Sequence, residues 1–338
     1  MYRRSTIPGS GGSAVFVTIP DMRIAVAALD GSFDSGLSVV LDVLATANSL
    51  RDDITGGPPP YEVVITGLAT TARTGHGLSV ETVPLTAMER LPDVFVVPAL
   101  AAKTPPRIVE AVRNHPLLEW IHTLYDSGVA LAAACTGTFF LAESGVLEGH
   151  PATTSWWLGP AFRNRFPAVG LDDSRTLVID GRLTTAGAAF AHIDLALSIV
   201  RQQSPALGDL VSRYLVIGDR PSQAAFAVPA LLAGTDPTLA AFERWIRDHL
   251  AEPLLISEVA TKLGVSERTL QRSTAAVLGM SPLDFVQEVR LDQATFLLRT
   301  TDLTASAVAA AVGYQNVSTL RSLVRRRRRV TLNALRTT

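Results

Sequence analysis

One cysteine in this 338-residue chain stands where it could do chemistry. The apolar run VALAAA at 129–134 leads directly into Cys135 and the residues TGT, and helical spacing follows over 139–145. A thiol at a sharp strand-to-helix turn lies near backbone N–H groups and the positive end of the helix dipole, which is expected to lower its pKa. A lone cysteine after an apolar strand is more commonly a small core residue. Both interpretations of Cys135 stay open at this point.

A second set of functional side chains lies near the end of the sequence. Arg268, Gln271 and Arg272 are three and four positions apart, a spacing that places them on one face of a helix. Leu270 points the other way, toward a core shared with the apolar residues of 256–263. Guanidinium groups match the acceptors of guanine, and a glutamine amide matches adenine. The pattern predicts a helix that reads base edges in double-stranded DNA.

The pattern around that helix is repeated. The motif VAxxxG at 259–264 recurs at 308–313, and Leu270 is echoed by Leu320. Each copy predicts a helix ending at glycine, a short turn and a second helix, which is a helix-turn-helix unit. The second helix of the later copy carries Ser318, Thr319, Arg321 and Ser322, and the run Arg325, Arg326, Arg327, Arg328 and Arg329 follows. These arginines predict attraction to phosphate with little sequence preference.

The distribution of charge supports a polyanionic partner. The formal net charge is −1, but residues 242–338 hold 14 Lys and Arg against 9 Asp and Glu. The rest of the chain holds 16 against 22. An acidic body with a basic C-terminal region favours DNA as the partner. A different acidic partner is the alternative, and its binding would show no sequence preference.

The elements that position these residues fall into two regions. Strands are predicted at 24–29, 61–67, 94–98 and 129–134, helices at 38–47, 117–125 and 189–201, and a hairpin over 177–185. This alternation is typical of a flavodoxin-like α/β domain, a mostly parallel sheet covered by helices on both faces. We expect a flexible tail at 1–21, the α/β domain at 22–220, a linker at 221–237 and an all-α domain with two helix-turn-helix units at 238–338.

Composition excludes several classes of protein. Apolar residues make up 47% and charged residues 18%, which excludes a disordered or fibrous chain. One cysteine excludes a disulfide framework and a multi-cysteine zinc module, and we expect neither a metal nor a cofactor. We predict no membrane span and no signal peptide, because long apolar runs are missing and no sustained apolar core stands between Arg3 and Arg4 and the PGSGG stretch at 8–12. The expected location is the cytoplasm.

Residues 258–336 resemble the AraC/XylS-type DNA-binding domain. The shared stretches are SERTLQR at 266–272, LGMSP at 278–282 and GYQNVS at 313–318. The resemblance implies that Arg268, Gln271 and Arg272 are base-facing in the first recognition helix, and that Ser318, Thr319 and Ser322 are so in the second.

The sequence departs from that family's pattern at several apolar positions. The family commonly has an aromatic residue at Thr274, Leu320 and Val324, a proline at Leu332 and a tyrosine at Leu335. Each lost large side chain is expected to cost about 1–3 kcal/mol unless neighbours fill the space, so packing beneath the second unit is expected to be thin. We expect the first unit to read sequence and the second mainly to hold the DNA backbone.

The segment from Cys135 to Trp156 resembles the class I glutamine-amidotransferase-like superfamily of the PfpI-like type. The branch it looks like is the GlxA group, in which such a domain precedes an AraC-type domain. Enzymes of the superfamily bring an acid, an elbow cysteine and a histidine together, and Asp34 is the candidate acid. Ser155 stands where the histidine is expected, and serine cannot take a proton near neutral pH. His150 and His192 are possible substitutes.

The missing histidine favours a retired catalytic pocket that binds a small molecule. Asp34, Cys135, Thr136 and Trp156 are expected to line it, and they suit a small polar or charged metabolite. The resemblance also implies a homodimer formed through the first domain. These expectations describe a sequence-specific transcriptional regulator with a sensing domain. The alternative is a cysteine-dependent hydrolase or hydratase with an accessory helical domain.

Overall fold

The structure is a computed structural model that describes residues 21–220, 222–223, 229, 233–234, 236–328 and 331–337. The chain divides into two compact units, with the described residues up to 223 in the first and those from 229 onward in the second. The expected tail, apart from Asp21, lies outside the described residues, as do Arg329 and most of the expected linker at 221–237.

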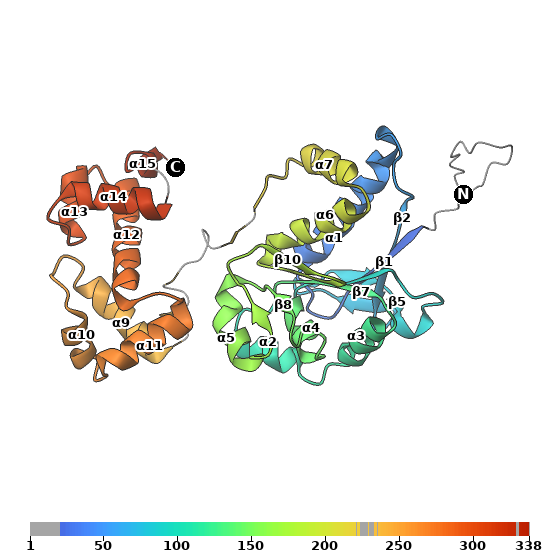
Figure 1. Ribbon diagram of the computed structural model, residues 1–338, viewed down its shortest axis with the longest axis horizontal. Helices are drawn as coiled ribbons and strands as arrows, with labels where there is room; N and C mark the ends of the chain where they lie inside the picture. Colours follow the sequence, from blue (N-terminus) through green and yellow to red (C-terminus); the bar gives the residue numbers. More distant parts are fainter. Residues whose placement is uncertain are drawn as a thin grey trace. The chain divides into compact units, whose positions relative to one another are not determined.

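A mostly parallel sheet forms the centre of the first unit (Figure 1). Among the described residues its strands are β1 (Met22–Ala27), β2 (Tyr61–Gly67), β5 (Val83–Pro84), β6 (Val94–Val97), β7 (Ala130–Ala134), β10 (Leu177–Asp180) and β11 (Leu183–Ala186). The strand order is β10-β11-β7-β6-β1-β2-β5, and every neighbouring pair is parallel except the hairpin β10–β11. Two small ribbons accompany the sheet, β3 (Thr71–Arg73) with β4 (Ser79–Glu81), and β8 (Pro151–Ala152) with β9 (Gly170–Leu171).

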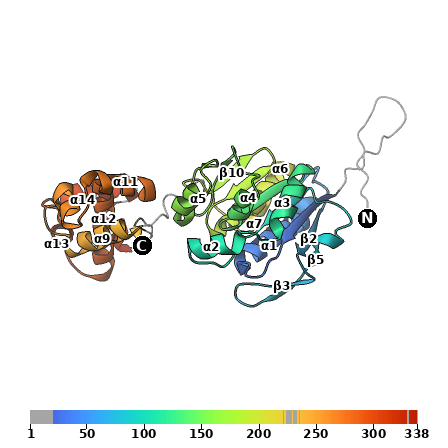
Figure 2. The ribbon, with the colours of Figure 1, turned by 90° about the horizontal axis from the view of Figure 1, so that it is seen from below.

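Helices cover both faces of this sheet (Figure 1, Figure 2). One face packs on α1 (Asp34–Leu50), α6 (His192–Gln203) and α7 (Pro205–Tyr214). The other packs on α2 (Pro105–Val112), α3 (Leu117–Asp126), α4 (Gly137–Glu143) and α5 (Gly159–Arg165). Side chains alternate between the two cores, since Ile24 and Val26 of β1 join the first whereas Ala25 and Ala27 join the second. The predicted α/β class is confirmed. The strands are apolar on both sides because helices cover both faces of the sheet.

The loops after the parallel strands meet at one edge of the sheet. The N–H of Phe33, after β1, donates to the carbonyl of Ala99, after β6, at 2.7 Å. The N–H of Leu100 donates to the hydroxyl of Thr136, after β7, at 2.6 Å. Since the carboxyl ends of parallel strands share one edge, residues distant in sequence are brought together here.

The second unit is helical. Its described helices are α9 (Pro237–Asp248), α10 (Ile256–Lys262), α11 (Glu267–Leu278), α12 (Pro282–Thr300), α13 (Ala305–Ala311), α14 (Val317–Arg328) and α15 (Ala334–Thr337). The pairs α10–α11 and α13–α14 are the two helix-turn-helix units, and α12 joins them (Figure 1). The predicted all-α class is confirmed. Within the described ranges, no helix is both long and apolar enough to cross a lipid bilayer.

Both helix-turn-helix units turn at a left-handed glycine and begin their second helix with a polar cap. Gly264 has φ +72° and Gly313 has φ +82°, values that favour glycine. The hydroxyl of Ser266 accepts the N–H of Thr269 at 3.0 Å, and the side-chain oxygen of Asn316 accepts the N–H of Ser318 at 2.9 Å. The two helix-turn-helix units therefore have the same backbone turn and differ in their capping residues.

The core beneath the second helix-turn-helix unit is filled despite the missing aromatic residues. Leu320 and Val324 have no solvent exposure, and they share a cluster with Leu291 of α12. Leu332 and Leu335, two of the positions that depart from the family pattern, lie in the same cluster and are 5% and 7% exposed. Leucines near the end of the chain thus occupy space beneath α14.

Candidate functional site

Cys135 occupies a strained turn between β7 and α4. Its φ is +56°, in the left-handed region, which costs a non-glycine residue about 1–2 kcal/mol. The neighbouring Gly137 fits because a Cβ there would collide with the carbonyl oxygen of Val97. Strain of this kind often marks a functional position. The local geometry is that of a nucleophile elbow, with Cys135 at its tip.

The thiol at this elbow is closed off and bonded internally. Cys135 is 6% exposed, and its sulfur accepts a hydrogen bond from the hydroxyl of Ser155 at 2.9 Å. The hydroxyl of Thr154 donates to the carbonyl of Cys135 at 2.7 Å. Burial raises the pKa of the thiol, although hydrogen bonds from Ser155 and the N–H of Thr136 oppose this. The lowered pKa predicted from sequence is wrong, because burial outweighs the favourable helix end.

Neither substitute histidine serves this thiol. His192 is fully buried, and its Nε2 accepts the N–H of Ala99 at 3.2 Å. Its Nδ1 lies 2.5 Å from the carbonyl oxygen of Ala189. Because a carbonyl can only accept, the proton is assigned to Nδ1, which donates this bond. Burial lowers the pKa of His192 to about 4, so the ring is neutral at physiological pH. His150 pairs instead with Asp180, at 2.8 Å. In the part of the chain that the structure describes, no histidine hydrogen-bonds to Cys135.

The other expected pocket residues are only partly gathered. Thr136 is 1% exposed and exchanges two hydrogen bonds with the backbone of Leu100. Asp34 begins α1 and is engaged by His76, whose Nδ1 lies 3.2 Å from its carboxylate. Burial would raise the pKa of Asp34, but hydrogen bonds from Thr74 and His76 hold it below its ordinary value. Trp156 is half-buried beside the elbow. The elbow thus unites Thr136, Ser155 and Cys135, whereas Asp34 has other partners.

Gln223 is a residue of this site that sequence reasoning missed. It is 4% exposed, and its Oε1 accepts the N–H groups of Trp156 at 3.3 Å and Ala188 at 3.1 Å. Its Nε2 donates to the carbonyls of Thr154 at 2.7 Å and Arg175 at 3.1 Å. The sequence placed Gln223 in the linker, and no local pattern marks it, because its partners all lie far away in the chain.

The first recognition helix presents the three predicted readers. Arg268, Gln271 and Arg272 of α11 are all exposed, whereas Leu270 and Thr274 have no exposure. The amide of Gln271 donates to Glu267 at 3.3 Å, within the same helix. An exposed row of hydrogen-bonding groups opposite a buried face is the geometry a recognition helix needs.

The second recognition helix exposes a different set. Its exposed predicted residues are Ser318, Thr319, Arg321, Ser322, Arg325 and Arg326 of α14. A small cavity of about 220 Å³ lies beside this helix, with Thr319, Ser322 and Arg326 in its lining. Hydroxyl groups therefore dominate the start of α14, and arginines its end.

Comparisons with known proteins agree with both units. The family models "DJ-1/PfpI family" and "Helix-turn-helix domain" match residues 105–202 and 259–338. The HTH-type transcriptional regulator CdhR of Pseudomonas aeruginosa is 32% identical over 206 residues, which span 60% of this chain and 61% of that regulator. The HTH-type transcriptional regulator GlxA of Rhizobium meliloti is 28% identical over 275 residues, 78% of this chain and 81% of its own. This chain joins a DJ-1/PfpI domain to an AraC-type helix-turn-helix domain.

A solved structure shares the fold of the DJ-1/PfpI domain. A putative transcriptional regulator protein from Vibrio parahaemolyticus aligns with a TM-score of 0.50 at 20% identity, over 58% of this chain and all of that one. The two family models leave residues 203–258 unmatched, and this stretch includes Gln223.

In the AraC-type domain, part of the arginine run is bound internally. Arg327 of α14 pairs with Asp284 at 2.5 Å and Glu288 at 2.9 Å. Arg328 pairs with Glu288 at 2.8 Å and Asp292 at 2.9 Å. The three acids stand four positions apart on α12, a stripe that is visible in the sequence and could have predicted the pairing. Within this run, Arg325 and Arg326 stay exposed.

Proposed function

We propose that this protein is a transcriptional regulator that binds double-stranded DNA in a sequence-specific manner through its AraC-type domain. The observation that carries the proposal is α11, on which Arg268, Gln271 and Arg272 share one exposed face. The helix is anchored from behind by the fully buried Leu270. Such a helix can enter the major groove, where guanidinium and amide groups read guanine and adenine.

The second helix-turn-helix unit would contact the next segment of the same groove. Recognition helices of paired units lie about one helical turn, ~34 Å, apart along the duplex. Ser318, Thr319, Arg321 and Ser322 would meet bases or sugars, and Arg325 and Arg326 would meet phosphates. Phosphate contacts fix the register of a protein on DNA, and base contacts specify the sequence.

The DJ-1/PfpI domain would sense a small metabolite and mediate homodimer formation. A sensing role at the elbow is supported by the raised pKa of Cys135 and by its bond to Ser155 rather than to a histidine. Asp34, Cys135, Thr136 and Trp156 would surround a ligand there. Because Cys135 and Thr136 are both less than a tenth exposed, the elbow would have to rearrange locally before such a ligand could bind.

Selection of bound sequences from a random DNA pool, using the purified full chain, tests DNA reading. An Arg268→Ala variant is expected to relax preference at one or two base positions, at about 1–3 kcal/mol. Arg244→Ala changes an exposed arginine of α9, outside both recognition helices, and is the matched control with unchanged preference. Equal preference in wild type and Arg268→Ala would show that α11 is wrongly assigned. Binding with no preference would favour a different acidic partner.

The strained elbow favours one second candidate, a cysteine-dependent hydrolase or hydratase. In that case Cys135→Ala would abolish turnover of a substrate. For a regulator, Cys135→Ala is expected to keep specific DNA affinity within about twofold, since the thiol lies in the other unit and is already protonated.

A further inference from the structure

A cavity of about 630 Å³ lies in the first unit, away from the thiol of the elbow. It is formed by the edge strand β10, helix α6 and the chain that follows α7, and β10 and α6 are neighbours in both views (Figure 1, Figure 2). Its volume is in the range of small-molecule sites, about 300–1,000 Å³.

The lining of this cavity carries one more positive than negative side chain. Arg175, Arg201 and Arg220 face two carboxylates, Asp194 and Asp219. Arg220 pairs with Asp194 at 2.9 Å, and Arg201 makes a long contact of 3.7 Å with Asp209, outside the lining. Arg175 has no ion-pair partner among the residues that the structure describes. The cavity therefore offers guanidinium groups that an anion could use.

Two buried donors in this cavity lack a partner. Thr176 is 6% exposed, and its hydroxyl has no hydrogen bond to any described residue. The Nε of Arg220 is also buried and unbonded within the described part of the chain. Folded proteins rarely leave such groups unsatisfied, so each one requires an explanation. Both atoms are closed to solvent, so a ligand oxygen reaches them once the two side chains turn toward the cavity.

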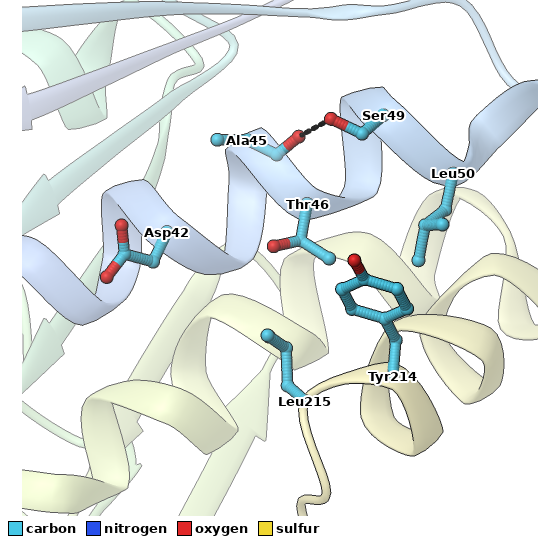
Figure 3. Close-up of a pocket in the computed structure, with 7 residues that line it drawn as sticks. All are labelled: Asp42, Ala45, Thr46, Ser49, Leu50, Tyr214 and Leu215. Atoms are coloured by element: carbon cyan, nitrogen blue, oxygen red, sulfur yellow. Dashed lines mark hydrogen bonds between the residues drawn. The ribbon is translucent and has the colours of Figure 1, made fainter.

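The hollow between α1 and α7 is different (Figure 3). It measures about 370 Å³, and no arginine or lysine is among its described lining residues. The hydroxyl of Ser49 there already donates to the carbonyl of Ala45 at 3.1 Å. Of the described residues with an unsatisfied buried donor, two line the arginine-lined cavity and none lines this hollow.

We propose that this cavity binds a small anionic metabolite through a carboxylate or phosphate group. Arg175 and Arg220 hold the anion, and the Thr176 hydroxyl turns toward the cavity and donates to one of its oxygens. Charge-assisted hydrogen bonds from guanidinium groups to carboxylate or phosphate are strong and directional, which suits this set of donors.

The position of the cavity gives the ligand a route to the DNA-binding domain, a consequence that rests on the proposed regulatory function. Arg220 lies after α7, the last helix described in the first unit, and its pair with Asp194 is open to competition from an anion. The backbone of Arg175 bridges to Ser222 and accepts the amide of Gln223 at 3.1 Å. An anion that moves either arginine thus acts where the chain leaves this unit.

Calorimetric titration of the full chain with succinate and with inorganic phosphate tests the site, at ionic strength held constant with sodium chloride. We expect one saturable site per chain for at least one probe. Binding of succinate alone identifies a carboxylate site, and binding of phosphate alone a phosphate site. Arg175→Gln and Thr176→Val should each weaken binding at least about tenfold, the loss of a hydrogen bond to a charged group.

Controls separate a binding role from a structural one. Arg213→Gln, an exposed arginine of α7 outside the cavity, should bind the probe as wild type does. Thr176→Val should not lower the melting temperature of the free protein, because it removes an unsatisfied hydroxyl. If neither probe binds above the chloride control, or if both variants bind like wild type, the site is overturned.

DNA-binding assays separate the site from the proposed function. Without probe, Arg175→Gln should bind DNA as wild type does. If the wild-type chain binds no DNA, that result contradicts the proposed regulatory function and leaves the proposed anion site standing. With probe, the DNA affinity of wild type should change while that of Arg175→Gln does not. A probe that binds but leaves wild-type DNA affinity unchanged overturns the coupling.

Discussion

The two helix-turn-helix units share a backbone and differ in where their arginines go. In the described part of the second domain, no ion pair holds Arg268 or Arg272 of α11. Arg327 and Arg328 of α14, by contrast, are bound to acids of α12. Repetition of a motif therefore predicts the fold of each copy, but the partners of each side chain decide whether it is free to bind DNA.

The acidic stripe of α12 explains this difference. The side chain of Glu288 is only 9% exposed and lies between Arg327 and Arg328. A carboxylate this deeply buried needs positive partners, because an unpaired charge loses its hydration. The end of α14 is therefore attached to α12, and only part of the arginine run is available to phosphate.

Loss of a buried leucine should be the largest effect, and it tests whether the two cores are equally packed. Leu320→Ala and Leu270→Ala are each expected to cost about 2–5 kcal/mol, since both side chains are fully buried. Urea unfolding followed by helical circular dichroism measures the loss. A cost below about 1 kcal/mol for Leu320→Ala alone would show that the second core is loose.

Removal of one bound arginine should have the next largest effect. Arg327→Ala is expected to reduce the free energy of unfolding by about 1–3 kcal/mol, because Glu288 and Asp284 each lose a charged hydrogen-bond partner. Arg325→Ala, the matched exposed control, should stay within about 0.5 kcal/mol of wild type. Equal stability of the two variants would remove the distinction between bound and free arginines.

Removal of the exposed arginines should act on DNA binding alone. The double variant Arg325→Ala and Arg326→Ala is expected to lower the slope of log affinity against log salt by roughly 2, about 0.9 for each phosphate contact. Base preference should not change. Titrations at several salt concentrations measure the slope, and an unchanged slope would mean that these arginines do not reach phosphate.

The smallest effect is on the stability of the fold at low pH. Hydrogen bonds from Ser281, and then from Arg327, hold the pKa of Asp284 below its ordinary value of 3.8, although burial opposes them. A lowered pKa stabilises the fold above the unfolded value and loses that contribution as the pH falls through the folded value. Wild type should therefore exceed Asp284→Asn in melting temperature at pH 6, and the difference should shrink below about pH 4. A difference that does not depend on pH would contradict this.

Elements with strong periodicity could be predicted from the sequence. The strand at 61–67 has the predicted bounds in β2, and the outward face of α11 follows from the spacing of its apolar residues. Helix α7 was missed although Ser204 caps it and Pro205 begins it, because its apolar face was not recognised. Local patterns predict local structure, since they record which face of an element is buried.

The chemistry of the candidate site was harder to predict. The absence of a histidine at Ser155 is visible in the sequence, but the bond from Ser155 to the thiol is not. Burial raises the pKa of Cys135, so a prediction from the adjacent helix alone had the wrong sign. The carbonyl and amide partners of Gln223 come from three separate loops, and no spacing within the sequence connects them.

Gln223 also determines where the molecule can be divided to make hybrids. A graft of the first unit onto a foreign module, joined at residue 220 where the composition changes, would delete this side chain. The N–H groups of Trp156 and Ala188 would then lose their acceptor inside the protein. A junction placed after residue 223 keeps the interior intact, and this gives hybrid regulators a practical cutting point.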